Sequence, residues 1–330
     1  MTTVQFAENF ELKFEITEKC NSNCSFCHQG YGKNNSHREL TFALFKERLI
    51  WAENLGIRSV RFTGGEPTLN KDLKRMVEIA FKRGFYVTVN TNGLVAANFY
   101  SKLAPYVNMY KISLPAASSN GVDSLTGVNG SFLKKISAIS QCLEIGTEIQ
   151  ILTVIIEQNI GQLEEFLIFA DNIPQLKWVP LRVESSSYCK RPISRIKMQE
   201  LAEELNRLME KYPGKVDRLG LATPFCSVSP VELGAKVFMG RADDCGPFHS
   251  LTITPDNELI ACYSCRTPMT HFHDLKQLTA DKEYNRLTQK TGLPKMCKTC
   301  KYVDRCMGGC LAPDTIVKYD GGWVDYLAVP

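Results

Sequence analysis

Residues 11–27 read ELKFEITEKCNSNCSFC, a short apolar run followed closely by three cysteines. Leu12–Ile16 has the apolar composition of a buried β-strand. Cys20, Cys24 and Cys27 then follow, with gaps of three and two residues, in a loop too polar to belong to a core. Three thiolates leave a tetrahedral zinc ion one ligand short, although His28 could complete a Cys₃His site. On a [4Fe–4S] cube the same three thiolates leave one iron open for a substrate.

Downstream of this stretch, β-rich apolar runs alternate with segments whose apolar residues recur at helical spacing. The six predicted strands are Leu12–Ile16, Ser59–Thr63, Tyr86–Asn90, Met109–Leu114, Ile149–Ile155 and Leu176–Val183. Alternating strands and helices predict an α/β fold with a parallel sheet and right-handed crossovers. Six such units suit an open twisted sheet or an incomplete barrel, and both place chemistry at the C-terminal ends of the strands.

Composition narrows the class of protein. The chain has 330 residues, 44% of them hydrophobic, and a formal net charge of +4 from interleaved lysines, arginines and acids, so nucleic-acid binding is not indicated. Met1–Asn9 lacks the apolar stretch of a secretory signal, and no run is long enough for a membrane helix. We therefore expect a cytoplasmic protein. In that compartment thiols stay reduced, so 13 cysteines in clusters indicate metal.

The first cysteine motif resembles a known family signature. Cys-x-x-x-Cys-x-x-Cys, with Phe26 before its last cysteine, is similar to the motif of the radical S-adenosylmethionine (SAM) superfamily. The second predicted strand ends in Thr63-Gly64-Gly65-Glu66-Pro67, which resembles the family's Gly-Gly-Glu-Pro motif that holds the amino group of SAM. We expect the two glycines to let the main chain approach a ligand closely.

Later strand ends extend this resemblance. The third ends in Asn90-Thr91-Asn92-Gly93 and the fourth in Ile112-Ser113-Leu114, while Leu125–Gly127 and Gly130–Phe132 also resemble the family. One departure is Leu114-Pro115-Ala116, where many relatives have Leu-Asp-Gly. The residues implied to contact SAM are Phe26, Gly64, Gly65, Glu66, Pro67, Asn92 and Ser113.

The resemblance implies a partial (β/α)6 barrel and a specific reaction. Cys20, Cys24 and Cys27 would bind a [4Fe–4S] cluster whose open iron takes SAM. One electron from the cluster would cleave SAM to a 5′-deoxyadenosyl radical, which abstracts a substrate hydrogen. The chain is thus expected to be a radical SAM enzyme.

A second group of cysteines lies near the C-terminus. Cys297-x-x-Cys300-x₅-Cys306-x₃-Cys310 follows the pair Cys245 and Cys262, an arrangement that resembles the SPASM extension with its two auxiliary [4Fe–4S] clusters. The resemblance implies that Cys245, Cys262 and Cys310 bind auxiliary cluster I. It likewise assigns Cys297, Cys300 and Cys306 to auxiliary cluster II.

Each set lacks one ligand. Cys226 is our candidate for cluster I, with Cys265 as its competitor, and an open site facing the substrate is the alternative. For cluster II no cysteine follows Leu311, so an aspartate substitutes or the cluster is incomplete. The candidate aspartates are Asp314, Asp320 and Asp325. A zinc ribbon is the alternative interpretation of the whole region.

The change of pattern after the helical segment Arg195–Lys211 predicts a domain boundary near Gly214. Residues 1–214 would form the radical SAM core and residues 215–330 the auxiliary-cluster module. Cys142 lies in a helical pattern and is expected to be a core thiol. Cys189 follows the sixth predicted strand, where a thiol could donate a hydrogen atom to a substrate radical.

The motifs specify the cofactors better than the substrate. We favour maturation of a ribosomally made peptide or protein, with a flavodoxin or ferredoxin as electron donor. Since few residues precede Cys20, a separate peptide-recognition protein is a further expected partner. The alternatives are a radical dehydrogenase or epimerase of a small molecule, such as an aminoglycoside or nucleotide sugar, and a non-catalytic zinc or Fe–S module. The molybdenum-cofactor GTP cyclase shares the first motif but has a simpler C-terminal one.

The segment from Cys310 to Val317, with Asp320-Gly321-Gly322 after it, also resembles the opening block of an intein. Attack of the Cys310 thiol on the Gly309 carbonyl would begin splicing. This hypothesis would place the missing cluster cysteine in a segment beyond Pro330. The alternative is that residues 311–330 are an unusual SPASM tail, in which Asp-Gly forms an ordinary turn.

Overall fold

The computed structural model describes residues 10–33, 37–184, 186, 188–189, 193–269 and 275–329. Met1–Asn9 and Pro330, which entered the predictions above, lie outside the described residues.

Six parallel strands form the main sheet, and each pairs with the next along the chain. They are β1 (Glu11–Glu15), β2 (Ser59–Thr63), β3 (Tyr86–Thr91), β4 (Met109–Ser113), β5 (Glu148–Ile155) and β6 (Leu176–Arg182). The predicted strand ends differ from these by one residue at most. The predicted α/β class with a six-stranded parallel sheet is confirmed.

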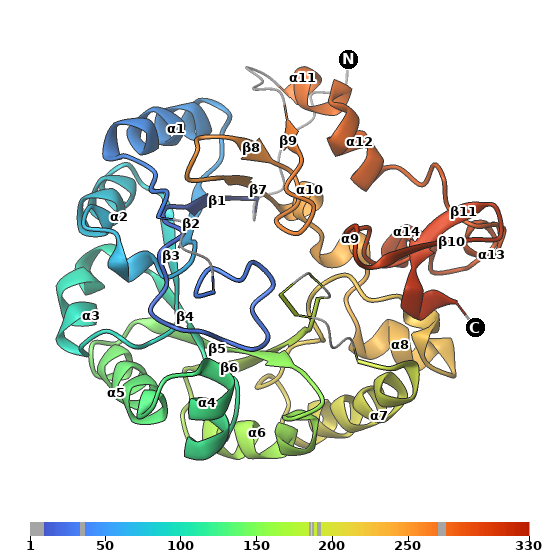
Figure 1. The fold of residues 1–330 in the computed structure, drawn as a ribbon, viewed down its shortest axis with the longest axis horizontal. Coiled ribbons are helices and arrows are strands. Elements are labelled where there is room, and N and C mark those ends of the chain that lie inside the picture. The colour runs from blue at the N-terminus through green and yellow to red at the C-terminus, as the bar shows by residue number, and fades with distance from the viewer. Residues whose placement is uncertain are drawn as a thin grey trace.

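Helices connect the strands and cover one side of the sheet. They are α1 (Phe42–Asn54), α2 (Leu73–Lys82), α3 (Asn98–Leu103), α4 (Ser119–Thr126), α5 (Ser131–Glu144), α6 (Leu163–Asp171) and α7 (Arg195–Lys211). In α2, Leu73, Met76, Val77 and Ala80 are buried, which is the one-sided pattern of an amphipathic helix. Thr41 caps α1, its hydroxyl accepting a hydrogen bond from the Leu44 amide. Figure 1 shows the helices outside a curved sheet, with the loop after β1 across its centre.

The sheet continues past the predicted boundary near Gly214. Strand β7 (Ser250–Ile253) pairs with β1 in parallel, and β8 (Leu259–Ile260) and β9 (Pro268–Met269) extend the sheet antiparallel. The strand order is β6-β5-β4-β3-β2-β1-β7-β8-β9. The C-terminal half therefore shares hydrogen bonds with the N-terminal strand, and the division at residue 214 stays a proposal.

Short elements make up the rest of the C-terminal half. They are α8 (Val231–Val237), α9 (Arg241–Asp244), α10 (Gly246–His249), α11 (Leu275–Ala280), α12 (Lys282–Thr288), α13 (Lys295–Lys298), α14 (Val303–Cys306) and the hairpin β10 (Ile316–Tyr319) and β11 (Gly322–Asp325). In Figure 1 these elements, yellow to red, complete the ring begun by the parallel strands.

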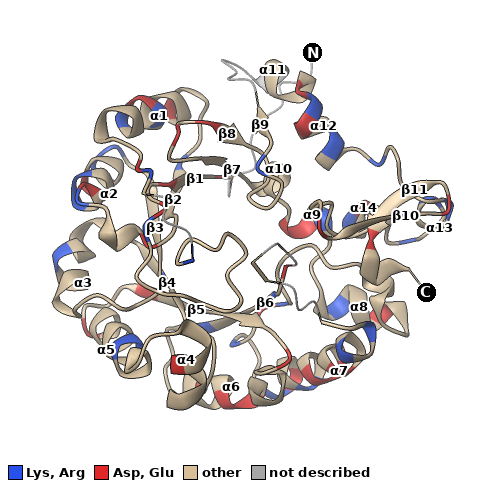
Figure 2. Ribbon diagram, in the orientation of Figure 1, with Lys and Arg blue, Asp and Glu red and all other residues tan. Residues whose placement is uncertain are grey.

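Charged residues of both signs lie along outer helices of the ring, as Figure 2 shows for α1 and α7. This matches the interleaved charges of the sequence. Among the described helices, none has the length and apolar character needed to cross a membrane.

Candidate active site

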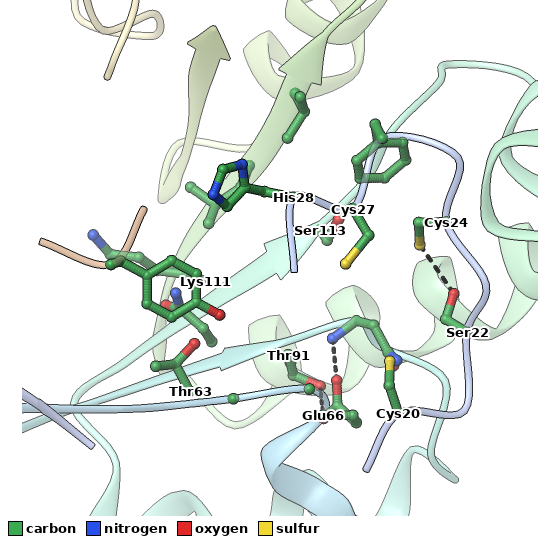
Figure 3. Close-up of a pocket in the computed structure, with 18 of the residues that line it drawn as sticks. Cys20, Ser22, Cys24, Cys27, His28, Thr63, Glu66, Thr91, Lys111 and Ser113 are labelled. Atoms are coloured by element: carbon green, nitrogen blue, oxygen red, sulfur yellow. Dashed lines mark hydrogen bonds between the residues drawn. The ribbon is translucent and has the colours of Figure 1, made fainter. Parts of the chain in front are cut away.

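A cavity of about 300 Å³ lies at the C-terminal ends of the parallel strands (Figure 3). Its wall includes Cys20, Cys24 and Cys27 after β1, Thr63–Glu66 at the end of β2, Asn90–Asn92 at the end of β3, and Ser113 of β4. Of the predicted SAM contacts, Phe26, Gly64, Gly65, Glu66, Asn92 and Ser113 line this cavity. Pro67 is buried beside them, at the start of a 3₁₀ turn, Pro67–Leu69.

The loop that carries the three cysteines is held by the main chain at the end of α4. The amides of Asn23 and Ser25 donate to the carbonyls of Thr126 and Leu125, at 2.8 and 2.9 Å. The Ser22 hydroxyl donates to the same Thr126 carbonyl, at 3.2 Å. The Leu-Thr-Gly segment that resembled the family therefore positions the cysteine loop.

The two glycines of the second motif pack against the main chain that leads into the cysteine loop. The amides of Gly65 and Glu66 donate to the carbonyls of Thr17 and Lys19, both at 2.7 Å. A Cβ at Gly64 would overlap the Thr17 carbonyl oxygen, and one at Gly65 would overlap that of Lys19. Gly64 also has a φ of +141°. These glycines let the second motif approach the chain that leads into the cysteine loop. Their expected close approach to a ligand stays a prediction.

Glu66 is fully buried and joins the ends of β2 and β3. Its Oε1 accepts hydrogen bonds from the Thr68 amide, the Thr68 hydroxyl and the Thr91 hydroxyl, at 3.2, 2.6 and 2.8 Å. Its Oε2 accepts from the Asn92 amide at 2.6 Å. Burial raises the pKa of this carboxyl group, and these bonds oppose the shift. Much of the hydrogen-bonding capacity of the carboxylate is thus used within the protein.

A buried lysine, Lys135 of α5, ties β3 to β4. Its ammonium group donates to the carbonyl oxygens of Asn92 and of Ser113, the latter at 3.0 Å. The Asn92 side chain in turn donates to Asn21 Oδ1, at 2.7 Å, in the cysteine loop. Burial lowers the pKa of Lys135 to about 8, while Cys24 and Glu66 act in the opposite direction. Lys135 belongs to none of the sequence motifs described above.

Other polar side chains reach the cavity without being named from the sequence. Asn90 Oδ1 is buried without a hydrogen-bond partner among the described residues, and so is His28 Nδ1. His28 Nδ1 lies 3.7 Å from Glu184 Oε2. Burial lowers the pKa of Lys111, on the same wall, to about 8. Asn90 belongs to the quoted segment Asn90-Thr91-Asn92-Gly93. The sequence did not predict that its side chain would line the cavity.

The donor set fits an iron–sulfur cluster and its ligand. Burial raises the pKa of Cys20 to about 12 and also raises that of Cys24, so both thiols hold their protons when no cation is present. Iron would displace those protons and take three soft ligands from one loop. The unpartnered Asn90 oxygen and the polar strand ends on the same wall suit a small polar molecule.

Cys189, the predicted hydrogen-atom donor, belongs to the main hydrophobic core and is 4% exposed. It is absent from the described residues that line the cavity. Its role as a donor stays a prediction. Cys142 is fully buried in the same core, as expected.

The C-terminal cysteines lie in two places. Cys226, Cys297, Cys300 and Cys306 line one cavity. Cys265 packs on the apolar cluster that contains Cys310, and its side chain is hydrogen-bonded to that of Cys262. Cys226 is thus beside the cysteines assigned to cluster II, although our candidate role for it was in cluster I. Over the described residues, no three His, Cys, Asp or Glu side chains converge as a single-ion site.

The aspartates proposed as substitute ligands lie elsewhere. Asp314 and Asp320 are exposed, and none of the three lines the cavity of the four cysteines. Asp325 is fully buried, and its Oδ2 accepts from Arg182 at 2.8 Å and from the Cys310 amide at 3.1 Å. This carboxylate therefore ties the tail to the end of β6. The intein hypothesis at Cys310 stays a prediction.

Comparisons with known proteins agree with this geometry. Residues 14–170 match the family model described as the radical SAM superfamily. Mycofactocin maturase MftC of Mycolicibacterium smegmatis is 28% identical, over 94% of this chain and 83% of MftC. PqqA peptide cyclase of Rhizobium meliloti is 20% identical, over 90% of this chain and 80% of the cyclase.

A solved structure has the same fold over almost the whole chain. Streptococcus suis SuiB bound to S-adenosylmethionine aligns with a TM-score of 0.78 and 18% identity, covering 99% of this chain and 78% of SuiB. SuiB bound to its precursor peptide SuiA aligns with a TM-score of 0.77, also at 18% identity, over 99% of this chain and 76% of that one.

Proposed function

We propose that this chain, which belongs to the radical SAM superfamily and has SPASM-type homologues over nearly its full length, matures a ribosomally made peptide or protein. It is a radical SAM enzyme related to peptide-modifying maturases. The observation that carries the chemical part of the proposal is the joint position of three thiols, the Gly-Gly-Glu-Pro segment and polar strand ends around one cavity.

In this proposal Cys20, Cys24 and Cys27 bind a [4Fe–4S] cluster, and the strand ends beside them bind SAM. When bound, this pair supplies one-electron cleavage of SAM and a radical that takes a hydrogen atom from the substrate. The Thr126 and Leu125 carbonyls and the Gly64-Gly65 contact hold the cysteine loop in place. The Lys135 ammonium group keeps the ends of β3 and β4 in register beneath it.

The rest of the cavity wall is the proposed substrate side. Arg182 and Glu184 reach it from the end of β6, Leu221 and Tyr263 from the C-terminal half, and Lys111 from β4. Ser264 donates to Glu184 at 2.6 Å, which fixes that carboxylate beside His28. Residues from both halves of the chain thus line the substrate side.

A peptide substrate is favoured over a small molecule by the relatives. MftC is named a maturase and the Rhizobium meliloti relative a peptide cyclase, and each is matched over 80% or more of its length. The alternative, a dehydrogenase or epimerase of a small molecule, would use Cys189 as hydrogen donor, and that thiol lies in the core. A flavodoxin or ferredoxin as electron donor, and a separate peptide-recognition protein, are part of the proposal.

The test has two stages, both with anaerobically reconstituted full chain. With SAM and dithionite we expect 5′-deoxyadenosine, detected by chromatography; none above the level without protein would refute the proposed chemistry. With SAM, reductant and a short peptide encoded beside this gene, we expect the mass of the peptide to change, as measured by mass spectrometry. An unchanged peptide together with a modified nucleotide sugar or aminoglycoside would favour the alternative.

A further inference from the structure

The C-terminal cysteines are interleaved along the chain but separate into two sets in space. Cys226, Cys297, Cys300 and Cys306 line a cavity of about 240 Å³, whose other walls are largely apolar, including Phe225, Val231, Met296 and Val303. Around this cavity the thiols lie on three short segments: a 3₁₀ turn (Phe225–Ser227), α13 with the turn after it, and α14. An apolar, thiol-lined cavity suits a cluster of several atoms.

The segments that carry these four cysteines make close backbone contacts with neighbouring helices. A Cβ at Gly234 of α8 would overlap the Phe225 carbonyl oxygen, and one at Gly240 would overlap that of Arg305 in α14. Arg195 of α7 donates to the Cys226 carbonyl at 3.1 Å. The turn at Cys226 is thus fixed against the core on one side, and α14 against α9 on the other.

The second set forms around the turn after β8. A Cβ at Gly246 would overlap the Ala261 carbonyl oxygen, so the chain beside Cys245 lies against the chain beside Cys262. Cys262 and Cys265 are hydrogen-bonded through their side chains, and Cys265 shares an apolar cluster with Cys310. Cys265 Sγ donates to the Leu311 carbonyl at 3.8 Å, immediately after Cys310.

The sulfur atoms of Cys265 and Cys310 also accept hydrogen bonds from neighbouring groups. Arg286 donates from Nη2 to Cys265 Sγ at 3.3 Å, and the Ala312 amide donates to Cys310 Sγ at 3.3 Å. Charged and amide donors aimed at sulfur stabilise thiolate more than thiol. Both contacts therefore suit sulfurs that carry negative charge.

Arg241 gives an independent reason to expect negative charge here. It is 1% exposed, and its Nη1 donates to the Leu287 carbonyl, whereas its Nε and Nη2 have no hydrogen-bond partner among the described residues. No carboxylate is among its main electrostatic neighbours. Its electrostatic neighbours are three thiols from both sets, Cys245, Cys306 and Cys310, and a second cation, Arg286. A buried cation without a countercharge is costly. Anionic, thiolate-ligated clusters on either side would supply that countercharge.

We propose that the module holds two clusters with four cysteine ligands each: Cys226, Cys297, Cys300 and Cys306 on one, and Cys245, Cys262, Cys265 and Cys310 on the other. This deepens the proposed function, because neither cluster then has an open iron for a substrate. Both clusters carry electrons, and the open iron of this enzyme is the one held by Cys20, Cys24 and Cys27.

The test counts iron without measuring activity. In the full chain with Cys20, Cys24 and Cys27 changed to Ala, anaerobic reconstitution should give about eight irons per chain. Adding Cys226→Ala or Cys265→Ala should remove about four, or give a three-iron EPR signal after mild oxidation. Cys142→Ala, a buried thiol outside both sets, is the matched control and should keep all eight.

Retention of about eight irons with an unchanged spectrum in Cys226→Ala or Cys265→Ala would overturn that residue's assignment, as would zinc in place of iron. Mössbauer spectroscopy of the variant with Cys20, Cys24 and Cys27 changed to Ala tests both clusters without a further substitution. If cysteines bind every iron, the spectrum should contain no separate component from an open or oxygen-bound iron. These readouts are independent of the substrate, so a failed peptide assay leaves them unaffected.

Discussion

The two cysteine-rich regions differ in what surrounds their sulfurs. Cys20, Cys24 and Cys27 are half-buried on a wall shared with Asn90 and Asn92, which are polar. The four cysteines beginning with Cys226 share their cavity mainly with apolar side chains. A site that admits a polar molecule needs polar partners and a free ligand position, whereas a site that only passes electrons is best closed. The count of thiols and the polarity of their neighbours thus distinguish the roles.

The largest effect should come from removing the open site. Changing Cys20, Cys24 and Cys27 together to Ala should reduce 5′-deoxyadenosine formation to the level without protein, because no iron remains to bind SAM. Iron content should fall by about four of about twelve per chain. Unchanged formation of 5′-deoxyadenosine would mean that the two regions are not divided as we propose.

A second prediction concerns how the open site is held. Gly65→Ala places a Cβ on the Lys19 carbonyl oxygen, so the cysteine loop must shift. Because a displacement of about 1 Å can cost on the order of 100-fold in rate, we expect a fall of at least about tenfold in SAM cleavage. Gly161→Ala is the matched control, since nothing lies within 4 Å of its Cβ. Equal activity of the two variants would contradict the packing role.

Lys135→Met tests the support beneath that site. It keeps the apolar stem and leaves the carbonyls of Asn92 and Ser113 without their buried donor. We expect the free energy of unfolding to fall by about 2 kcal/mol, measured by denaturant titration of the apo chain. Loss of SAM cleavage should exceed loss of auxiliary iron, because the lysine lies on the N-terminal side only. Equal losses in both regions would instead indicate a general folding defect.

The smallest effect is a pH dependence of the apo chain. Burial raises the pKa of Cys20 and of Cys226 to about 12 from 9.0. Between pH 9 and 12 the unfolded chain therefore binds fewer protons than the native chain, and stability falls as pH rises. Below pH 9 this contribution is fully present. Burial lowers the pKa of Lys111 and Lys135 from 10.5 to about 8. Between these pH values the unfolded chain binds more protons at the two lysines, so their contribution raises stability as pH rises.

We expect the thiols to dominate above pH 9, with the unfolding free energy of the apo chain falling there in urea titrations at successive pH values. The iron-loaded chain should lose much of this dependence, since its ligands are already deprotonated. Identical slopes for apo and loaded chain would argue against metal ligation in both regions.

Sequence patterns predicted the strands well because apolar runs and helical spacing are local properties. They also placed Phe26, Glu66 and Ser113 at one cavity, since parallel strands end at one edge. The partners of Cys226 could not be predicted, because its neighbours come from segments about 70 residues away in sequence and are set by glycine contacts at Gly234 and Gly240. The role of Lys135 could not be predicted because its partners are backbone carbonyls, which every residue type carries.

The pairing of β1 with β7 has a consequence for biosynthesis. Strand β1 leaves the ribosome early, but its second neighbour exists only once Ser250–Ile253 has been made. Until then Leu12 and Phe14 lie in an unfinished edge strand, which is the kind of segment that aggregates in a nascent chain. Chains that end near residue 214 lack β7, so β1 should be an exposed edge strand in them as well. Parallel pairing between strands so far apart in sequence forms slowly. The strand that leads into the first cysteine loop is completed late, so iron is expected to enter after synthesis has passed β7.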